Sequence, residues 1–415
     1  MAVIKPFCAV RPTPELADKV AALPYDVMNS EEAREMVKDN PYSFLHVDKA
    51  EIDLEPGVDL YDPMVYAKAR ENLLRFIEEG TLIREPKKAF YIYTLVMDGH
   101  PQTGLVSLAS VDDYLNNVVK KHEFTRADKE ADRIRHVEVT NFHTGPIFLT
   151  YVPKDSITKL LEEYQKNHTP LYDFIAEDGV GHKAWSILDE DVIQRLEEEF
   201  SQVESLYIAD GHHRAASAVR VGEKKRKENP GYTGDEEFNH FLAVIFPSNE
   251  LRIMDYNRVV KDLNGKSEKE FIQAVEENFT VTPASQPGPY KPQKKHEFGM
   301  YLEDRWYVLE AKPHIVFDED PLKRIDCKIL QDNLLHPILG IEDPRTDKRI
   351  DFIGGIRGLK ELETRVKKNM KVAFSLYPTL IEDLIAISDA GMVMPPKSTW
   401  FEPKLRSGLF LHDLE

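Results

Sequence analysis

The feature that most constrains this chain is a run of nine residues near its middle, LYIADGHHR, from Leu206 to Arg214. The stretch from Leu206 to Ala209 is short and apolar, which is typical of a buried strand. Gly211 favours a tight turn, because glycine accepts backbone conformations that other residues avoid. A helix follows from about His213, with small residues on one of its faces. The sequence therefore predicts a strand that turns directly into a helix, with Asp210 at the junction.

A junction of this kind suits an anion such as phosphate. The first N–H groups of a helix have no partner within the helix, and the helix dipole favours negative charge beside them. Arg214 adds a planar cation that matches phosphate oxygens, and His212 and His213 can donate hydrogen bonds to them. We therefore predict a phosphate site made of Gly211, His212, His213 and Arg214. The alternative is that Asp210 only caps the helix and that the histidines lie on an exposed turn.

The charge and cysteine content narrow the class of protein. The chain carries 72 acidic and 54 basic residues, a formal charge of −18. This field repels nucleic acids, so we expect no nucleic-acid partner, although a small nucleotide can still bind in a local positive pocket. Only two cysteines, Cys8 and Cys327, are present, which favours a reducing compartment. Lys5, Pro6 and Arg11 interrupt the first apolar stretch, and no apolar run is long enough to span a membrane. We therefore expect a cytoplasmic globular protein with no membrane partner.

Strands and helices alternate along the first part of the chain, which predicts an α/β fold. The expected elements include a strand at residues 44–47, a hairpin at Asp98-Gly99, a charged helix at 121–141 and a second hairpin at 297–311. The composition changes after Asn264-Gly265, where a Pro- and Lys-rich stretch follows one more helix. The sequence therefore predicts two domains, residues 1–265 and 266–415, both of α/β type.

Familiar catalytic motifs are absent from the sequence. No Gly-x-Gly-x-x-Gly, His-Glu-x-x-His, Gly-x-Ser-x-Gly or paired Cys-x-x-Cys occurs. Gly265-Lys266-Ser267 matches the end of a P-loop, but Val260 stands where the first glycine of that loop would be. The usual dinucleotide, zinc, P-loop and serine-hydrolase interpretations therefore lack support.

The charged segment from Lys121 to Arg126 is a second candidate for the site. Lys121, His122 and Arg126 offer cations for phosphate, and Glu123 offers a carboxylate that can act as a base. The alternative is a charged helix with its faces in water, which the same residues would also produce.

Three other features are weighed in the same way. Asp26, in the turn after Pro24, is a candidate to line the substrate cleft, against a plain turn aspartate. Lys397, in a Pro-rich segment, can reach a substrate carboxylate or phosphate, against a rigid surface arm. The basic residues Arg345 and Arg349 are interpreted as part of a solvated loop.

The junction sequence resembles the nucleotide loop of the ParB/sulfiredoxin superfamily. Sulfiredoxins have their nucleophilic cysteine where this chain has His212, so that chemistry is excluded. ParB proteins bind DNA, which the acidic charge disfavours. The free serine kinases carry the same Asp-Gly-His-His-Arg pattern. Over its whole length the chain resembles the prokaryotic family called domain of unknown function 1015, through ALPYDV (22–27), NPYSFLHV (40–47), KHEFT (121–125), ADGHHR (209–214) and MPPKSTWFEPKLRSGL (394–409).

These resemblances imply a ParB/sulfiredoxin-like nucleotide-binding core with insertions in residues 1–265. The kinase resemblance implies a phosphotransferase that uses ATP or ADP with Mg²⁺ and acts on the hydroxyl of a small molecule, with free serine or a related amino acid as the model substrate. Asp210 is then the first candidate for the base that accepts the hydroxyl proton, and Glu123 is the second. A homodimer is compatible with this interpretation.

Two other functions stay open at this point. One is a nucleotide-binding regulator with little or no catalysis. The other is a metal-dependent hydrolase with Asp210, His212 and His213 as ligands, which is the weakest of the three because adjacent histidines rarely bind one ion together.

Overall fold

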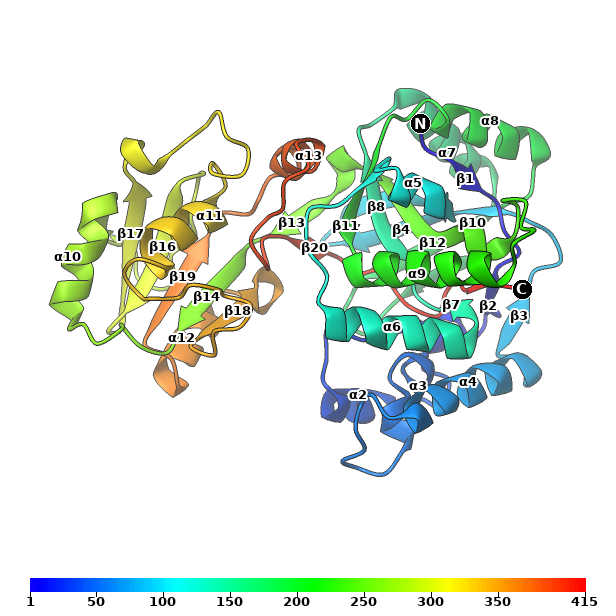
Figure 1. The fold of residues 1–415 in the computed structure, drawn as a ribbon, viewed down its shortest axis with the longest axis horizontal. Helices are drawn as coiled ribbons and strands as arrows, with labels where there is room; N and C mark the ends of the chain where they lie inside the picture. The colour runs from blue at the N-terminus through cyan, green and yellow to red at the C-terminus, as the bar shows by residue number, and fades with distance from the viewer. The chain divides into compact units, whose positions relative to one another are not determined.

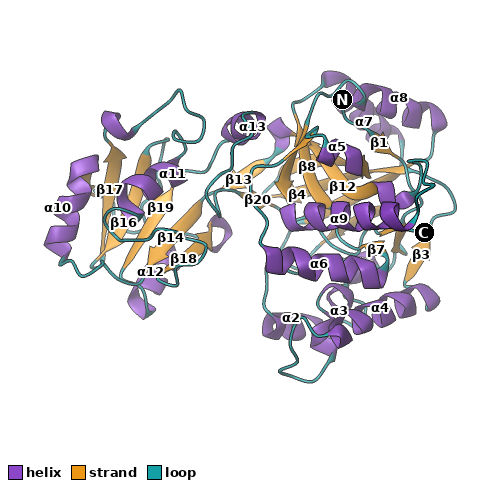
Figure 2. Ribbon diagram, viewed as in Figure 1, coloured by secondary structure: helices purple, strands orange, loops and turns teal.

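The computed structural model describes residues 1–415, and the chain divides into two compact units. Unit 1 contains Met1–Leu251 and Pro403–Glu415, and unit 2 contains Arg252–Glu402. Each unit combines helices with strands, so the fold is mixed α/β as predicted (Figures 1 and 2). None of the helices is both long and apolar enough to cross a membrane.

A nine-stranded mixed sheet forms the centre of unit 1, in the order β6-β11-β8-β12-β5-β4-β10-β9 with β1 beside β5. Its strands are β1 (Ile4–Lys5), β4 (Phe90–Met97), β5 (His100–Ser110), β6 (Val119–Lys120), β8 (Ile147–Tyr151), β9 (Tyr172–Ile175), β10 (Gly181–Ile187), β11 (Leu206–Asp210) and β12 (His240–Pro247). Strand β11 pairs parallel with β6 and antiparallel with β8. It therefore lies inside the sheet, with every residue buried except the partly exposed Asp210.

Helices cover this sheet, and two of them matter for the site. Helix α9 (His212–Glu228) packs on the sheet through Ala215, Ala218 and Val219, and α6 (Ala127–Thr140) lies beside it (Figure 1). The small side chains of α9 allow this close approach. The other helices of unit 1 are α1 (Ala17–Val20), α2 (Ser30–Val37), α3 (Leu45–Asp48), α4 (Pro63–Glu78), α5 (Val111–Leu115), α7 (Asp155–Asn167) and α8 (Glu190–Phe200), with 3-10 turns η1 (Ala50–Asp53), η2 (Glu237–Asn239) and η3 (Ser248–Glu250).

The last residues of the chain complete unit 1. Strand β21 (His412–Asp413) pairs antiparallel with β7 (Phe142–His143). Val10 and Leu411 exchange two backbone hydrogen bonds of 3.0 and 2.8 Å, and Val10 belongs to β2 (Val10–Pro12), which pairs with β3 (Leu82–Arg84). Leu411 is fully buried in a core cluster with Val10 and Phe142. The carboxyl-terminal segment is therefore part of the core of unit 1.

Unit 2 is built on a six-stranded antiparallel sheet, in the order β15-β17-β16-β19-β14-β18. Its strands are β14 (Tyr256–Val260), β15 (Phe279–Pro283), β16 (Glu297–Leu302), β17 (Arg305–Ala311), β18 (Ile350–Gly354) and β19 (Val372–Leu376), and its helical segments are α10 (Glu268–Asn278), η4 (Pro313–Ile315), α11 (Asp326–Leu330), η5 (Gln331–Leu335), η6 (Gly355–Arg357), α12 (Lys360–Lys368) and α13 (Ile381–Asp389). The chain enters through β13 (Arg252–Met254) and leaves through β20 (Trp400–Glu402), and these two strands pair with each other. Unit 2 is thus an insertion into the sequence of unit 1.

The observed units differ from the predicted division at residues 265 and 266 in two respects. The second unit begins earlier, at Arg252, because β14 belongs to its sheet. The segment from Pro403 onward belongs to unit 1, because its strand β21 pairs with β7. Neither difference is visible in composition, since both depend on strand pairing between distant parts of the chain.

The predicted strand at residues 44–47 is wrong. Residues Leu45–Asp48 form the short helix α3, which the turn η1 follows. Phe44, Leu45 and Val47 are buried in a helical cluster instead of a sheet. The three apolar residues Phe44, Leu45 and Val47, with His46 among them, do not distinguish a short buried strand from one turn of a buried helix.

The predicted charged helix at residues 121–141 is only partly right. Helix α6 begins at Ala127 and ends before Asn141, whose φ of 62° closes it in the left-handed conformation. Residues 121–126 form a loop, and Thr125 donates a hydrogen bond of 2.6 Å to Glu130 in the first turn of α6. This loop is what brings His122 to the start of α9.

Both predicted hairpins are confirmed. Asp98 and Gly99 connect β4 to β5 with φ values of 52° and 75°. Glu303 and Asp304 connect β16 to β17 with φ values of 47° and 56°. Two left-handed residues in a two-residue loop are what a type I′ turn requires.

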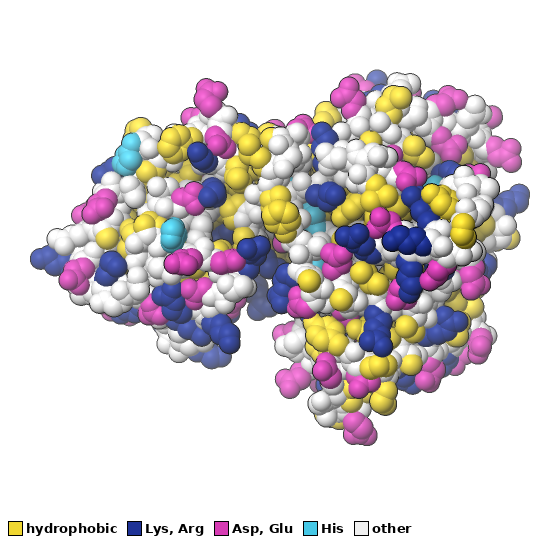
Figure 3. Space-filling view, viewed as in Figure 1, with side chains coloured by type: hydrophobic (Ala, Val, Ile, Leu, Met, Phe, Trp, Pro, Cys, Tyr) yellow, Lys and Arg dark blue, Asp and Glu magenta, His cyan; other side chains and the backbone are white.

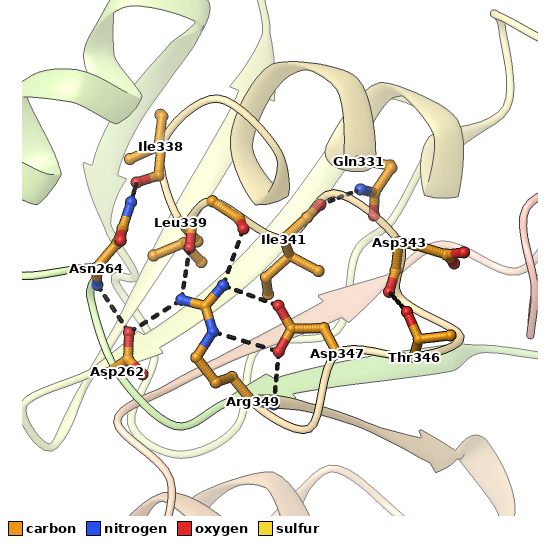
Figure 4. Close-up of polar contacts among 11 residues, drawn as sticks. Asp262, Asn264, Gln331, Ile338, Leu339, Ile341, Asp343, Thr346, Asp347 and Arg349 are labelled. Atoms are coloured by element: carbon orange, nitrogen blue, oxygen red, sulfur yellow. Dashed lines mark hydrogen bonds and ion pairs between the residues drawn. The ribbon is translucent and has the colours of Figure 1, made fainter.

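The basic residue Arg349 has a structural role in unit 2 and is not solvated on an open loop (Figure 4). Its guanidinium donates to the carbonyl oxygens of Leu339 and Gly340 over 3.0 and 2.9 Å, and it pairs with Asp347 over 2.8 Å. The contacts tie the end of the turn after η5 to the start of β18. Because its donors are used in this way, Arg349 is not a candidate anion site.

Candidate functional site

The junction between β11 and α9 has the predicted form. The chain leaves the sheet at Asp210, turns at Gly211 with a φ of 92°, and begins α9 at His212. A Cβ atom at Gly211 would lie 3.1 Å from Nε of Arg214, so glycine is needed for space as well as for backbone conformation. No side chain caps the amino end of α9. The first-turn N–H groups are therefore oriented as an anion-binding end of a helix requires.

Asp210 is held by a residue from the far end of the sequence. Its Oδ2 accepts a hydrogen bond of 3.0 Å from the Lys404 ammonium, and its Oδ1 accepts one of 2.9 Å from the Gly211 N–H. Burial alone would raise the pKa of the Asp210 carboxyl, but Lys404, Arg214 and the Gly211 N–H outweigh it and hold the pKa well below its ordinary value. Asp210 is therefore a stable carboxylate that fixes the turn, and Lys404 brings a cation to the junction.

Two buried imidazole rings lie beside the start of α9. The His122 and His212 rings meet edge to face, with centroids 4.5 Å apart. Burial lowers the pKa of His122 to about 4 and that of His212 well below its ordinary value, so both rings are neutral at pH 7. Both ring nitrogens of His122 and Nε2 of His212 are buried without a hydrogen-bond partner. Buried polar atoms are rarely left unpaired, so these nitrogens indicate a ligand that supplies their partner.

Only some residues of the loop 121–126 face the junction. The Arg126 N–H donates a hydrogen bond of 3.1 Å to Nε2 of His213, so this loop and α9 are joined directly. The Arg126 guanidinium pairs with Asp128 over 2.8 Å, and the Lys121 ammonium lies 4.1 Å above the ring of Tyr114. The structure therefore brings His122 and His213 together at the junction but directs the charged ends of Lys121 and Arg126 to other partners.

Glu123, predicted as the second base, lies in the same loop and is half-buried. Its neighbour His122 points toward His212, and successive residues of an extended loop point in different directions. The role of Glu123 as a base stays a prediction.

Arg214 is fixed by backbone contacts. One of its terminal nitrogens donates to the carbonyl oxygen of Pro146 over 2.5 Å. A Cβ atom at Gly145 would lie 3.4 Å from the same nitrogen, so the two glycines, Gly145 and Gly211, make room for the guanidinium. Arg214 lines a small cavity of about 30 Å³ together with Asp48 and Arg133. The guanidinium is thus pre-positioned, which reduces the entropy lost when it binds an anion.

Basic side chains gather over α9 on the face of unit 1 seen in Figure 3. Arg220 and Lys224 belong to this exposed group, with 63% and 56% of their side chains accessible. They pair with Glu130 and Glu138 of α6 over 3.5 and 2.7 Å. Exposed pairs of this kind contribute little, so this surface differs in character from the buried position of Arg214.

A larger cavity of about 270 Å³ adjoins the small one. The two cavities share Tyr25, Asp48, Arg133 and His136 in their linings. Asp26 is exposed and lines the larger cavity, as its predicted place near a substrate cleft requires.

Four residues of the site, Asp48, Arg133, His136 and Lys404, could not be singled out from the sequence. Their charges resemble surface charges in the sequence, and the expected strand at 44–47 and helix at 121–141 gave them no common location. All except Lys404 line both cavities. A signal was available only for Arg133 and His136, which lie three residues apart and so share one face of α6.

Lys397 lies in unit 2, where it contacts Arg258 and Tyr256. Its backbone has a φ of 58°, and its carbonyl oxygen accepts a hydrogen bond of 3.1 Å from Arg258. Its ammonium lies 5.8 Å from the centre of the Tyr256 ring. The role of Lys397 toward a substrate stays a prediction.

The alternative of a metal-dependent hydrolase does not fit the contacts at the junction. Asp210 is bound to Lys404, and Nε2 of His213 accepts from the Arg126 backbone. No group of three His, Cys, Asp or Glu side chains in the chain is arranged to hold a metal ion. The three proposed ligands, Asp210, His212 and His213, therefore do not form one set.

Several solved structures are similar to this chain at low identity. A variant of a free serine kinase in complex with AMP is 14% identical, with a TM-score of 0.39, over 75% of this chain and 92% of that one. Another variant of a free serine kinase, in complex with ADP, is 14% identical with a TM-score of 0.38 over the same shares of 75% and 92%. A conserved hypothetical protein from Pyrococcus furiosus is 15% identical with a TM-score of 0.36, over 75% of this chain and 97% of that one. A search of curated proteins finds no match.

The family described as "Protein of unknown function (DUF1015)" matches residues 4–328. The match includes four of the five segments on which the resemblance was based, those at Ala22, Asn40, Lys121 and Ala209, and the fifth, at 394–409, lies outside it. It spans well over half of the chain, and the protein belongs to the DUF1015 family.

Proposed function

We propose that unit 1 binds a nucleotide at the β11–α9 junction and transfers a phosphoryl group from it to the hydroxyl of a small molecule. The acceptor in this proposal is free serine or a related amino acid, and the donor is ATP or ADP. One observation carries the proposal: the uncapped start of α9 lies beside the buried, unpartnered nitrogens of His122 and His212.

The junction offers several hydrogen-bond donors and cations that can bind a phosphate group. The first N–H groups of α9 can donate to phosphate oxygens, and the helix dipole favours their charge. Arg214 is a fixed cation at the same turn, and Lys404 is a second one nearby. The neutral rings of His122 and His212 can donate hydrogen bonds without a charge of their own.

Phosphoryl transfer depends on positioning and on neutralisation of charge more than on covalent chemistry. Mg²⁺ prefers oxygen ligands and is usually held by phosphates with one or two carboxylates. Asp210 is already engaged by Lys404, so the nucleotide phosphates would supply most of the Mg²⁺ ligands, with Glu123 of the loop 121–126 as the candidate carboxylate. When bound, the ion would neutralise charge on the phosphates. The residues of this chain would hold the nucleotide still and keep its terminal phosphate beside the acceptor.

Asp210 and Glu123 remain the bases predicted from the sequence. The contact between Asp210 and Lys404 favours a positioning role for Asp210, because a carboxylate with a lowered pKa is a weak base. The same contact supports the alternative function, a nucleotide-binding regulator with little or no catalysis.

A direct experiment separates these functions. The full chain is incubated with Mg²⁺ and either ATP or ADP, with a pool of serine, threonine and homoserine, and products are identified by mass spectrometry. We expect a phosphorylated amino acid in the amount of nucleotide consumed. Nucleotide binding by calorimetry without any product would favour the regulator, and the absence of binding to either nucleotide would refute both functions.

A further inference from the structure

The larger cavity of unit 1 has an unusual wall. It is enclosed by α3, η1, α4, α6 and the turn at Tyr25. Five charged residues of this wall are almost fully buried, with exposures of 6% for Asp48, 8% for Lys49, 6% for Glu51, 8% for Asp132 and 9% for Arg133. Asp, Glu, Lys and Arg are almost never buried unless they are paired, because removing a charge from water is costly. Each of these buried charges is therefore expected to have a partner of opposite charge.

Four of the five charges are paired within the wall. Lys49 and Glu51 lie 3.0 Å apart, and Ser30 donates to Glu51 over 2.7 Å. Arg133 pairs with Asp132 over 2.8 Å, and the guanidinium lies 4.0 Å from the centre of the Tyr25 ring. These contacts fix the orientation of both cations and both carboxylates.

Asp48 is the charge without an ionic partner. Its Oδ1 accepts a hydrogen bond of 2.8 Å from the Thr144 hydroxyl, and it forms no ion pair. Three carboxylates and two cations thus leave one negative charge in excess in the buried wall. A cationic group on a ligand would balance that charge.

Asp48 also connects the two cavities. It lines both of them, and Arg214 lines the smaller one. Thr144, which donates to Asp48, precedes Gly145, where a Cβ atom would lie 3.4 Å from the Arg214 guanidinium. A nucleotide phosphate at Arg214 and a molecule in the larger cavity would therefore meet at Asp48.

We propose that the larger cavity is the acceptor subsite, that it takes a small hydroxyl compound with both an ammonium and a carboxylate group, and that Asp48 is the catalytic base. This inference rests on the proposed function. In the step, the acceptor O–H bond breaks and its proton goes to the Asp48 carboxylate. The acceptor oxygen forms a new P–O bond as the bond between the terminal phosphate and its bridging oxygen breaks. The shortened nucleotide leaves with the electron pair of the broken bond.

The size and charge of the cavity support this class of acceptor. A volume of about 270 Å³ leaves room for a molecule the size of an amino acid. Lys49 and Arg133 can face a carboxylate, and the Glu51 and Asp132 carboxylates of the same wall can face an ammonium group. Asp48 then remains for the hydroxyl.

The test uses the full chain with Mg²⁺, ATP or ADP, and serine, threonine and homoserine as probes. Asp48→Asn keeps the shape and the acceptor for the Thr144 hydroxyl, so we expect the transfer rate to fall about 100-fold or more while nucleotide affinity changes less than about twofold. Asp113→Asn is the matched control, because Asp113 is 7% exposed, accepts one backbone hydrogen bond from Val3 and lines neither cavity. We expect it to keep wild-type transfer.

A second variant tests the cavity without changing a charge. Ala69 lines the larger cavity from helix α4 and is 1% exposed. Ala69→Leu therefore places a larger side chain in the cavity, and leucine is compatible with the helix because it has a high helix propensity. We expect at least a tenfold higher KM for the amino acid with unchanged nucleotide affinity. Saturation-transfer NMR without nucleotide would show probe binding to the wild type and its loss in Ala69→Leu.

The outcomes separate this inference from the proposed function. Transfer that survives Asp48→Asn but is lost in Asp210→Asn would overturn the assignment of the base. An unchanged amino-acid KM in Ala69→Leu, or no probe binding to a wild type that binds nucleotide, would overturn the acceptor subsite. Probe binding that depends on Ala69 in a protein that binds no nucleotide would refute the proposed function and retain the subsite.

Discussion

The Lys404 ammonium donates a hydrogen bond of 3.0 Å to the Asp210 carboxylate, across 194 positions of sequence. This contact joins the last segment of the chain to the end of β11, where the predicted phosphate site begins. Only 11% of the Lys404 side chain is exposed, against 33% for Asp210. The pair therefore attaches the carboxyl-terminal segment to unit 1 and also neutralises the Asp210 carboxylate at the junction.

Replacement of Lys404 should show this connection. Lys404→Met removes the cation and should lower the free energy of unfolding at pH 7 by about 1–2 kcal/mol, since the pair is partly exposed. The pKa of Asp210 is below its ordinary value in the folded state. The pair's stabilisation is therefore present above pH ~4 and is lost as the pH falls through the folded pKa. Urea unfolding between pH 7 and pH 3 should show a smaller acid-dependent loss in Lys404→Met than in the wild type.

The control for this prediction is Lys183→Met, because Lys183 pairs with the exposed Asp173 on the surface of unit 1 over 3.0 Å, and such pairs contribute little to stability. It should leave the acid dependence attributable to Asp210 unchanged. Identical acid dependence in the wild type and Lys404→Met would contradict the assigned role of the Asp210–Lys404 pair.

Removal of the fixed cation at the junction should weaken nucleotide binding. Arg214→Ala should raise the nucleotide Kd about 10- to 100-fold, since charge-assisted hydrogen bonds to phosphate are among the strongest. Arg220→Ala is the matched control on the same helix, because Arg220 is exposed and pairs with Glu130. Calorimetry should find a Kd near that of the wild type in Arg220→Ala. Equal affinities in the two variants would remove Arg214 from the phosphate site.

His122 should lower the free energy of unfolding, although it contributes to nucleotide binding. Both of its ring nitrogens are buried without partners, so His122→Phe should raise the free energy of unfolding by about 1 kcal/mol at pH 7. The same change should weaken nucleotide binding, because Phe offers no donor. A variant that gains stability and keeps full affinity would show that His122 does not contact the nucleotide.

The acid stability of the protein should depend on the same ring. Burial lowers the pKa of His122 from about 6.5 to about 4, so the unfolded state binds more protons between these values. This ring alone should then lower the free energy of unfolding by about 3 kcal/mol as the pH falls from ~6.5 toward 4, and other buried histidines with lowered pKa values, such as His136 and His240, add to the decline. Thermal unfolding across this range should show a weaker decline in His122→Phe. His100→Gln, at an exposed position, should decline as the wild type does.

The carboxyl-terminal segment should be essential to the core of unit 1. Leu411 is fully buried and pairs with Val10, so Leu411→Ala should lower the free energy of unfolding by about 2–4 kcal/mol. Leu115 is 46% exposed in the same unit, and Leu115→Ala should cost less than about 1 kcal/mol. Calorimetric unfolding of the two variants provides the comparison. A small effect at Leu411 would mean that the segment is only loosely attached.

The sequence predicted those parts of the fold that depend on neighbouring residues. The Asp98-Gly99 turn, the helix after Gly211 and the hairpin at Glu303 follow from local backbone preferences, and all three are present. The strand predicted at Phe44 is a helix, because three apolar residues in a stretch of four carry no period that separates the two structures. Local signals thus located the phosphate junction but not the helices around it.

The rest of the candidate site depends on contacts between distant residues. Asp48, Arg133 and Thr144 meet because α3, α6 and the chain before β8 pack together. A buried carboxylate and an exposed one are the same letter in a sequence, so neither the burial of Asp48 nor its lack of an ionic partner can be predicted from it. The pairing of Lys404 with Asp210 has no local signal at all.

The return of the carboxyl-terminal segment sets the order in which the protein is completed on the ribosome. Val10 is synthesised before unit 2, and Leu411, its pairing partner, after it. All of unit 2 is synthesised between them. Domains generally fold as they emerge, but here the inserted unit is finished first, while the nascent unit 1 still lacks the Lys404 that neutralises Asp210. The phosphate junction can therefore be completed only after all of unit 2 has been synthesised.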